Sequence, residues 1–160
     1  MTNETLTLEL LKIIPKEQLN EVFSQIECDI EPEFMGFVSV YKSISEIIPK
    51  HWTILDLGCA YAPQCFYFKD HKKYIGVDIF KGVRFRTENT EHVISRISDY
   101  IEKQDLFKEE TFAICSYVPQ WGGDNLELTR KSFKNIFTYY PHGEFNPIVS
   151  FKNIDKVKGG

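Results

Sequence analysis

The 160-residue sequence lacks any uninterrupted apolar run of about 18 residues, so we expect no transmembrane helix. Its first residues are acidic and are not a basic segment followed by an apolar one, so no secretory signal is expected. The spacing of its four cysteines fits neither a metal knuckle nor a dense disulfide framework. These absences predict a cytoplasmic protein without bound metal, whose free thiols are Cys28, Cys59, Cys65 and Cys115.

Several catalytic and phosphate-binding motifs are also missing. The sequence contains no G-x-x-x-x-G-K-[S/T] loop and no G-x-S-x-G elbow. No two of its four histidines stand at a short metal-ligand spacing. The run that starts at Gly58 reads G-C-A-Y-A-P instead of G-x-G-x-x-G, which leaves a dinucleotide site as a weak alternative.

The charge balance gives little support to nucleic-acid binding. Acidic side chains outnumber basic ones, 23 to 19, and the formal net charge is −4, which disfavours nonspecific attraction to phosphates. A basic cluster runs along the middle of the chain, and we interpret it as a solvated face, with contact to phosphates or an acidic partner as the alternative. Its members are Lys69, His71, Lys72, Lys73, Lys81, Arg84 and Arg86.

Length and composition predict one globular domain over residues 1–160, with 42% hydrophobic and 26% charged residues. Hydrophobic periodicity predicts N-terminal helices within residues 1–48, at 4–14, 16–26 and 33–48. An α/β core follows over residues 52–151. Its continuous apolar runs predict buried strands at 52–57, 73–79 and 111–118, which we expect to be parallel central neighbours.

Helices are predicted between these strands. Pro63 suits the first turn of a helix that continues to Lys69. A second helix begins after Asp124 or Asn125 and runs to about Tyr140, and a fifth strand covers residues 145–151. Alternating strands and helices indicate a doubly wound, mostly parallel sheet.

The third strand has two alternatives, at residues 83–88 or at 92–97. A parallel crossover needs about a dozen residues. Very few residues separate Ile79 from Val83, whereas enough residues for a crossover separate Ile79 from His92. The later strand, followed by a helix from Ser98, is therefore preferred.

Two acidic residues carry the functional hypothesis. Asp56 ends the first strand and precedes a turn of small residues, Gly58-Cys59-Ala60, where the backbone can approach a ligand closely. Asp78 ends the next strand, twenty residues after Gly58. An acid placed there can bind the two ribose hydroxyls of a nucleoside.

The segments D-L-G-C and G-V-D resemble the first two motifs of class I S-adenosylmethionine (SAM)-dependent methyltransferases. The resemblance implies a Rossmann-like fold that is abbreviated at its C-terminus, and SAM as cofactor. It places Gly58 beneath the methionine portion, Asp56 near the ligand's amino group and Asp78 on the ribose. An acid after the third strand is implied to face the adenine; Asp99 is the match, or Glu88 in the other register.

The wider site implied by this resemblance includes Cys59, Ala60, Tyr61, Ile79 and Ser116, with Tyr117 and Trp121 as aromatic residues over the substrate. The sequence departs from the family pattern because Ala60 and Ala62 stand where glycine is usual, and because the amino-group methyltransferase signature after the fourth strand is absent. Two hypotheses follow. The protein transfers a methyl group from SAM to an unidentified acceptor, or it is a methyltransferase-like binding protein without turnover, such as an immunity or antitoxin-like protein that blocks a partner.

Overall fold

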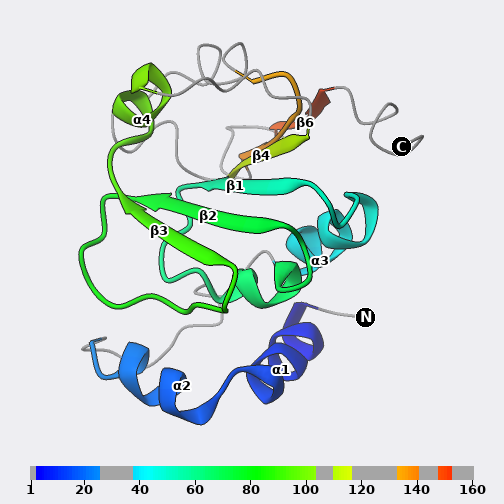
Figure 1. Ribbon diagram of the computed structural model, residues 1–160. Coiled ribbons are helices and arrows are strands. Elements are labelled where there is room, and N and C mark those ends of the chain that lie inside the picture. Colours follow the sequence, from blue (N-terminus) through cyan, green and yellow to red (C-terminus); the bar gives the residue numbers. More distant parts are fainter. Residues whose placement is uncertain (1–2, 26–37, 104–109, 117–132, 141–147, 153–160) are drawn as a thin grey trace.

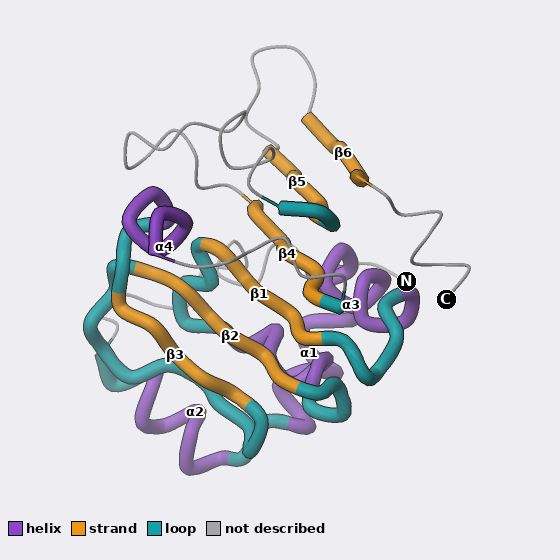
Figure 2. Tube along the Cα trace, turned by 45° about the horizontal axis from the view of Figure 1, so that its top comes forward, coloured by secondary structure: helices purple, strands orange, loops and turns teal. Residues whose placement is uncertain are grey.

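A computed structural model describes residues 3–25, 38–103, 110–116, 133–140 and 148–152. Within these ranges the chain forms a six-stranded sheet in the order β3-β2-β1-β4-β5-β6, with helices on both faces (Figures 1 and 2). The strands are parallel except β6, which is antiparallel to β5. The elements in chain order are α1 (Asn3–Ile13), α2 (Lys16–Phe23), α3 (Val38–Ile47), β1 (Thr53–Leu57), the 3₁₀ helix η2 (Pro63–Phe68), β2 (Lys73–Asp78), β3 (Thr90–Ile94), α4 (Ile97–Lys103), β4 (Thr111–Ser116), β5 (Ile136–Tyr140) and β6 (Ile148–Lys152).

The two faces of the sheet bury separate cores, because successive strand residues point to opposite faces. On one face Ile54, Tyr74 and Phe112 pack with side chains of α1, α2, α3 and η2. On the other face Leu55 and Val77 pack with side chains of α4. The central strands β2, β1 and β4 therefore form a buried middle layer, as their continuous apolar runs predict.

The structure confirms the predicted centre of the sheet. β2, β1 and β4 are consecutive and parallel, with Leu55 opposite Ile75 on one side and Ala113 on the other. It also confirms the later position of the third strand, although β3 begins at Thr90 and ends at Ile94. Ile97, which was predicted to end that strand, instead begins α4.

The prediction for residues 133–140 was wrong. The apolar spacing suggested the end of a helix, but Ile136–Tyr140 forms strand β5, parallel to β4. The run Ile-Phe-Thr-Tyr-Tyr is rich in β-branched and aromatic residues, which fit a buried strand between two neighbours. The predicted fifth strand overlaps β6 instead. Residues 117–132 and 141–147 lie outside the described residues, and with them the first half of the predicted helix.

The connection from β2 to β3 is unusual for a parallel crossover, which is ordinarily helical. Residues 79–89 contain no helix. Helix α2, which precedes the sheet in the sequence, lies against this connection and covers that part of the sheet (Figure 1). None of the described helices has the length and apolar character needed to span a membrane.

Candidate functional site

The loop after β1 adopts a left-handed backbone at three positions. Gly58 has φ of 81°, Ala60 of 51° and Ala62 of 60°. Only glycine adopts this region without strain, and an L-residue there costs roughly 1–2 kcal/mol. The two alanines thus adopt a backbone conformation that glycine would adopt without strain. Such strain persists only where the surrounding structure imposes it. We therefore expect contacts with neighbouring residues to fix the shape of this loop.

Hydrogen bonds join the loop to β2. The amides of Gly58 and Cys59 both donate to the carbonyl of Val77, at 2.7 Å and 3.2 Å. The amide of Ala60 donates to Oδ2 of Asp78 at 2.9 Å. The loop is thereby held against the carboxyl end of the neighbouring strand.

Asp78 receives a second backbone hydrogen bond, from the amide of Phe80 to Oδ1 at 2.9 Å. An ionised carboxylate offers about four acceptor positions. The two amides occupy one position on each oxygen, so each oxygen keeps one for a further donor. Asp78 is only half-buried, and the structure therefore presents a fixed carboxylate with unused acceptor capacity.

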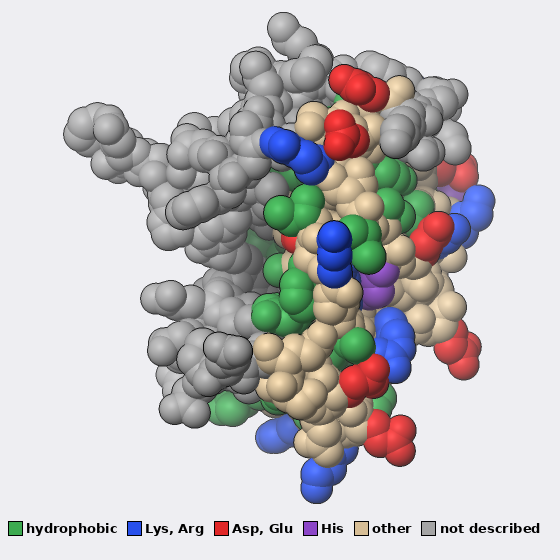
Figure 3. Space-filling view, turned by 90° about the vertical axis from the view of Figure 1, so that its left-hand side faces the viewer, with side chains coloured by type: hydrophobic (Ala, Val, Ile, Leu, Met, Phe, Trp, Pro, Cys, Tyr) green, Lys and Arg blue, Asp and Glu red, His purple; other side chains and the backbone are tan. Residues whose placement is uncertain are grey.

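Apolar side chains flank this carboxylate. Ile79 follows it in the chain and is 64% exposed, and Ile94, opposite Asp78 in the register of β2 and β3, is 58% exposed. Phe80 packs edge to face with Tyr61 of the loop, with ring centroids 4.7 Å apart. The edge at which β1–β3 end thus combines a carboxylate with exposed apolar surface. Figure 3 faces this edge and shows apolar side chains among acidic and basic ones, with no continuous basic surface in the coloured region.

Asp56 lies beneath the loop and is fully buried. Its carboxylate accepts hydrogen bonds from the hydroxyl of Tyr41 at 3.1 Å and from Nε2 of Gln64 at 2.8 Å, and a short one from the hydroxyl of Tyr74. Burial raises the pKa of Asp56 to about 6, although these three hydrogen bonds oppose the rise. Nε2 of Gln64 also donates to the carbonyl of Cys59 at 3.1 Å. Asp56 therefore supports the loop from below.

The thiol of Cys59 is buried as well, and desolvation raises its pKa well above the ordinary value. A thiol in such surroundings is a poor nucleophile. Cys59, Cys65 and Cys115 are all buried and none of the three forms a disulfide, and Cys28 lies outside the described residues. Within the described ranges no three His, Cys, Asp or Glu side chains are grouped so that they could hold a metal.

The remaining predicted site residues are placed as follows. Asp99 is exposed in the first turn of α4, after β3 ends, and Ser116 is the last residue of β4. Ser116 thus lies at the carboxyl end of a strand and Asp99 follows one, both at the edge that carries Asp78. Glu88 lies before β3 begins, at the opposite edge, so the structure excludes it as the acid after that strand. Tyr117 and Trp121 lie outside the described residues.

Sequence reasoning missed the residues that support the site from within. Tyr41, Gln64 and Tyr74 gave no signal because they lie on three other elements, which only the folded chain brings to Asp56. The basic cluster was interpreted as a solvated face, and for two of its members this was wrong. Arg84 is 4% and His71 3% exposed. Lys73 and Arg86 form ion pairs with Glu91 and Glu21.

Comparison with known proteins places the fold. No family model and no curated protein matches the chain. Among solved structures, a protein described as a SAM-dependent methyltransferase from Streptococcus mutans has a TM-score of 0.52 at 12% identity, over 69% of this chain and 36% of that one. An rRNA methylase from Streptococcus thermophilus has a TM-score of 0.48 at 12% identity, over 68% and 72%. A type II methyltransferase from Anaeromyxobacter dehalogenans has 0.46 at 15% identity, over 63% and 46%.

The chain thus spans less than half the length of two of these three proteins. At such identities the likeness concerns the fold alone, and it rests on the structure whose TM-score exceeds 0.5. The chain has the α/β Rossmann-like fold of class I SAM-dependent methyltransferases.

Proposed function

We propose that the carboxyl edge of β1 and β2 binds SAM and that the protein transfers its methyl group to an acceptor. The observation that carries the proposal is the carboxylate of Asp78, held by two backbone amides with one acceptor position unused on each oxygen. Two adjacent ribose hydroxyls match two such positions. Exposed Ile79 supplies an apolar surface next to this carboxylate, suited to one face of an adenine ring.

The residues fit the cofactor by their chemistry. The left-handed loop at Gly58–Ala62 brings backbone close to the place where the methionine portion would lie. Gln64 holds the carbonyl of Cys59 and the buried carboxylate of Asp56 together, so the loop does not need to reorganise on binding. SAM would supply a methyl group on a sulfonium sulfur. An acceptor nucleophile would attack the methyl carbon in line with the C–S bond, which would break to release the neutral thioether, and the acceptor's proton would pass to solvent. The protein's part is to orient donor and acceptor, which is the main source of catalysis in such a transfer.

Calorimetry with SAM and with its demethylated product, S-adenosylhomocysteine (SAH), tests this proposal. Asp78→Ala should weaken both affinities about tenfold to a hundredfold, since two unpaired hydroxyls cost roughly 1–3 kcal/mol. Asp70→Ala is the matched control because Asp70 is an exposed acid just before β2, at the opposite edge of the sheet. The affinities of the Asp70→Ala variant for SAM and SAH should equal those of the wild type.

Two results would overturn the proposal. One is no heat from wild-type protein with either ligand at millimolar concentration. The other is an equal loss of affinity in Asp78→Ala and Asp70→Ala. The first result would leave the methyltransferase-like binding protein without turnover as the better hypothesis, to be pursued by identifying its protein partner.

A further inference from the structure

Arg84 is a buried cation whose partners are mainly backbone carbonyls. Its guanidinium donates from Nη1 to the carbonyls of Gly76 at 3.2 Å and Val93 at 3.3 Å, and from Nη2 to those of Asp78 at 2.9 Å and Phe80 at 2.6 Å. No ion pair is found for it among the described residues. A buried charge is tolerated only when its donors are satisfied. Arg84 therefore depends on these four carbonyls, which belong to β2, β3 and the turn after β2.

The position of these carbonyls gives Arg84 a relation to the candidate site. Nη2 holds the carbonyls on both sides of Ile79, so it fixes the turn from Asp78 to Phe80. The amide of Phe80 in that turn donates to Oδ1 of Asp78. The orientation of the Asp78 carboxylate and the exposure of Ile79 thus both depend on the turn that Arg84 holds. A lysine cannot reproduce this contact, because its compact ammonium lacks the planar fork of donors.

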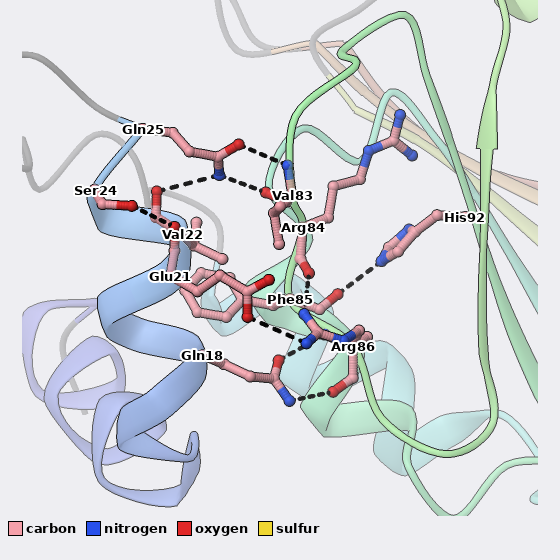
Figure 4. A network of polar contacts seen from close by, with 10 residues as sticks. All are labelled: Gln18, Glu21, Val22, Ser24, Gln25, Val83, Arg84, Phe85, Arg86 and His92. Atoms are coloured by element: carbon pink, nitrogen blue, oxygen red, sulfur yellow. Dashed lines mark hydrogen bonds and ion pairs between the residues drawn. The ribbon is translucent and has the colours of Figure 1, made fainter.

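The segment that carries Arg84 is itself held by α2 and by the turn that directly follows it (Figure 4). The side-chain amide of Gln25 donates to the carbonyl of Val83 at 2.8 Å and accepts from its amide at 2.6 Å. Gln18 makes the same pair of bonds with Arg86, each at 2.9 Å. The two glutamines bind the backbone on either side of Arg84 as a neighbouring strand would.

Phe85 anchors the segment on its other side. Its amide donates to the carbonyl of Tyr61 at 2.8 Å, and its carbonyl is 2.7 Å from Nε2 of His92. Its buried ring packs edge to face with Phe23 of α2, with centroids 5.9 Å apart. A continuous set of contacts therefore runs from α2 through residues 83–86 to the turn that holds Asp78.

We propose that Arg84 is a positioning residue for Asp78 and Ile79, and that α2 is an integral part of the nucleoside site because it holds Arg84 in place. Helix α2 here takes the position that a crossover helix between β2 and β3 would ordinarily have. The ligand named in this proposal rests on the proposed function, but the positioning of Asp78 does not. Ligand binding and the docking of α2 are consequently coupled, and each strengthens the other.

The experiment measures amide hydrogen exchange at Ala60 and Phe80 without ligand, because these two amides donate to the Asp78 carboxylate. Arg84→Met should speed their exchange about tenfold while amides of β4 keep their protection. Arg96→Met is the matched control, since Arg96 is an exposed arginine for which no side-chain hydrogen bond or ion pair is found among the described residues. It should leave both amides protected. Should Arg84→Met fail to fold, Gln25→Ala is measured in the same way, and it should expose the two amides more than Gln18→Ala does.

SAH affinity provides the second measurement, in a double-mutant cycle. Arg84→Met should weaken binding about fivefold to tenfold in the wild-type background and less than twofold in Asp78→Ala, because a residue that acts through Asp78 loses its effect without it. Full additivity of the two losses would overturn the proposal, as would unchanged exchange at Ala60 and Phe80. If wild-type protein binds no SAH while Arg84→Met still exposes these amides, the proposed function fails and the positioning role stands.

Discussion

The hydroxyl of Tyr41 in α3 donates a hydrogen bond at 3.1 Å to Oδ1 of Asp56, a fully buried carboxylate in β1. Gln64 of η2 and Tyr74 of β2 donate to its other oxygen. Four elements thus meet at one acid, and among the described residues no cation forms an ion pair with it. Hydrogen bonds from neutral donors offset only part of the cost of burying the charge.

This arrangement predicts a pH dependence of stability. The pKa of Asp56 is about 6 in the folded protein, against an ordinary value of 3.8. Between these values the folded state keeps a proton that the unfolded state has lost, so the unfolding free energy falls as pH rises. The stabilisation is complete below about pH 4 and is lost as pH passes through about 6. We expect a decrease on the order of 2–3 kcal/mol.

Urea denaturation of the wild type and Asp56→Asn across pH 3.5–8 measures this decrease. The asparagine side chain of the variant cannot ionise, so the unfolding free energy of the wild type minus that of the variant should fall through this range and level off above pH 7. Other carboxylates cancel in the difference. A difference that stays constant, or rises with pH, would contradict a raised pKa at Asp56.

The loop after β1 predicts different consequences for two glycine substitutions. Ala60 is exposed and Ala62 is fully buried, while both have left-handed φ. Glycine relieves the strain at either position, but at Ala62 it also removes a buried methyl group worth about 0.8 kcal/mol. Ala60→Gly should therefore unfold at a higher urea concentration than Ala62→Gly. Equal midpoints would mean that the methyl group of Ala62 contributes nothing to packing.

The cysteines should behave as free, protected thiols. Cys59, Cys65 and Cys115 are buried, and burial raises the pKa of Cys65 to about 12. Denatured protein should give four thiols per chain with a thiol reagent, and these three should react slowly in native protein. A denatured count of two or zero would indicate a disulfide that the spacing of the cysteines does not predict.

The sequence predicts the central strands because their apolar runs are continuous and their turns contain small residues. It predicts Asp78 and the loop at Gly58 because strand ends and glycine positions are local features. It does not predict β5, whose residues also match a helical spacing. That ambiguity is resolved only by pairing with β4, a contact between segments distant in the sequence.

The supporting residues could not be predicted for the same reason. Arg84 is a basic residue among basic neighbours, and its burial follows from carbonyls supplied by β2 and β3. Helix α2 and the turn after it cover the β2–β3 connection through Gln18 and Gln25. The partners of these two glutamines are 68 and 58 residues away in the sequence. Local patterns carry no information on such contacts.

Gly76 offers a final test of how the residues beneath the site pack. A Cβ at this position would lie 2.8 Å from Sγ of Cys59 and 2.9 Å from Nδ1 of His92. Gly76→Ala should destabilise the protein by about 1–3 kcal/mol, the usual cost of overpacking. In a Cys59→Ala background the sulfur is gone, so the same substitution should cost about 1 kcal/mol less, which is a coupling between neighbouring residues.

Cys115→Ala is the matched control, because Cys115 is a buried cysteine that belongs to the other core. With that background the cost of Gly76→Ala should be unchanged. Urea denaturation of the single and double variants gives both couplings, and equal couplings for the two cysteines would show that Cys59 does not limit the space above Gly76.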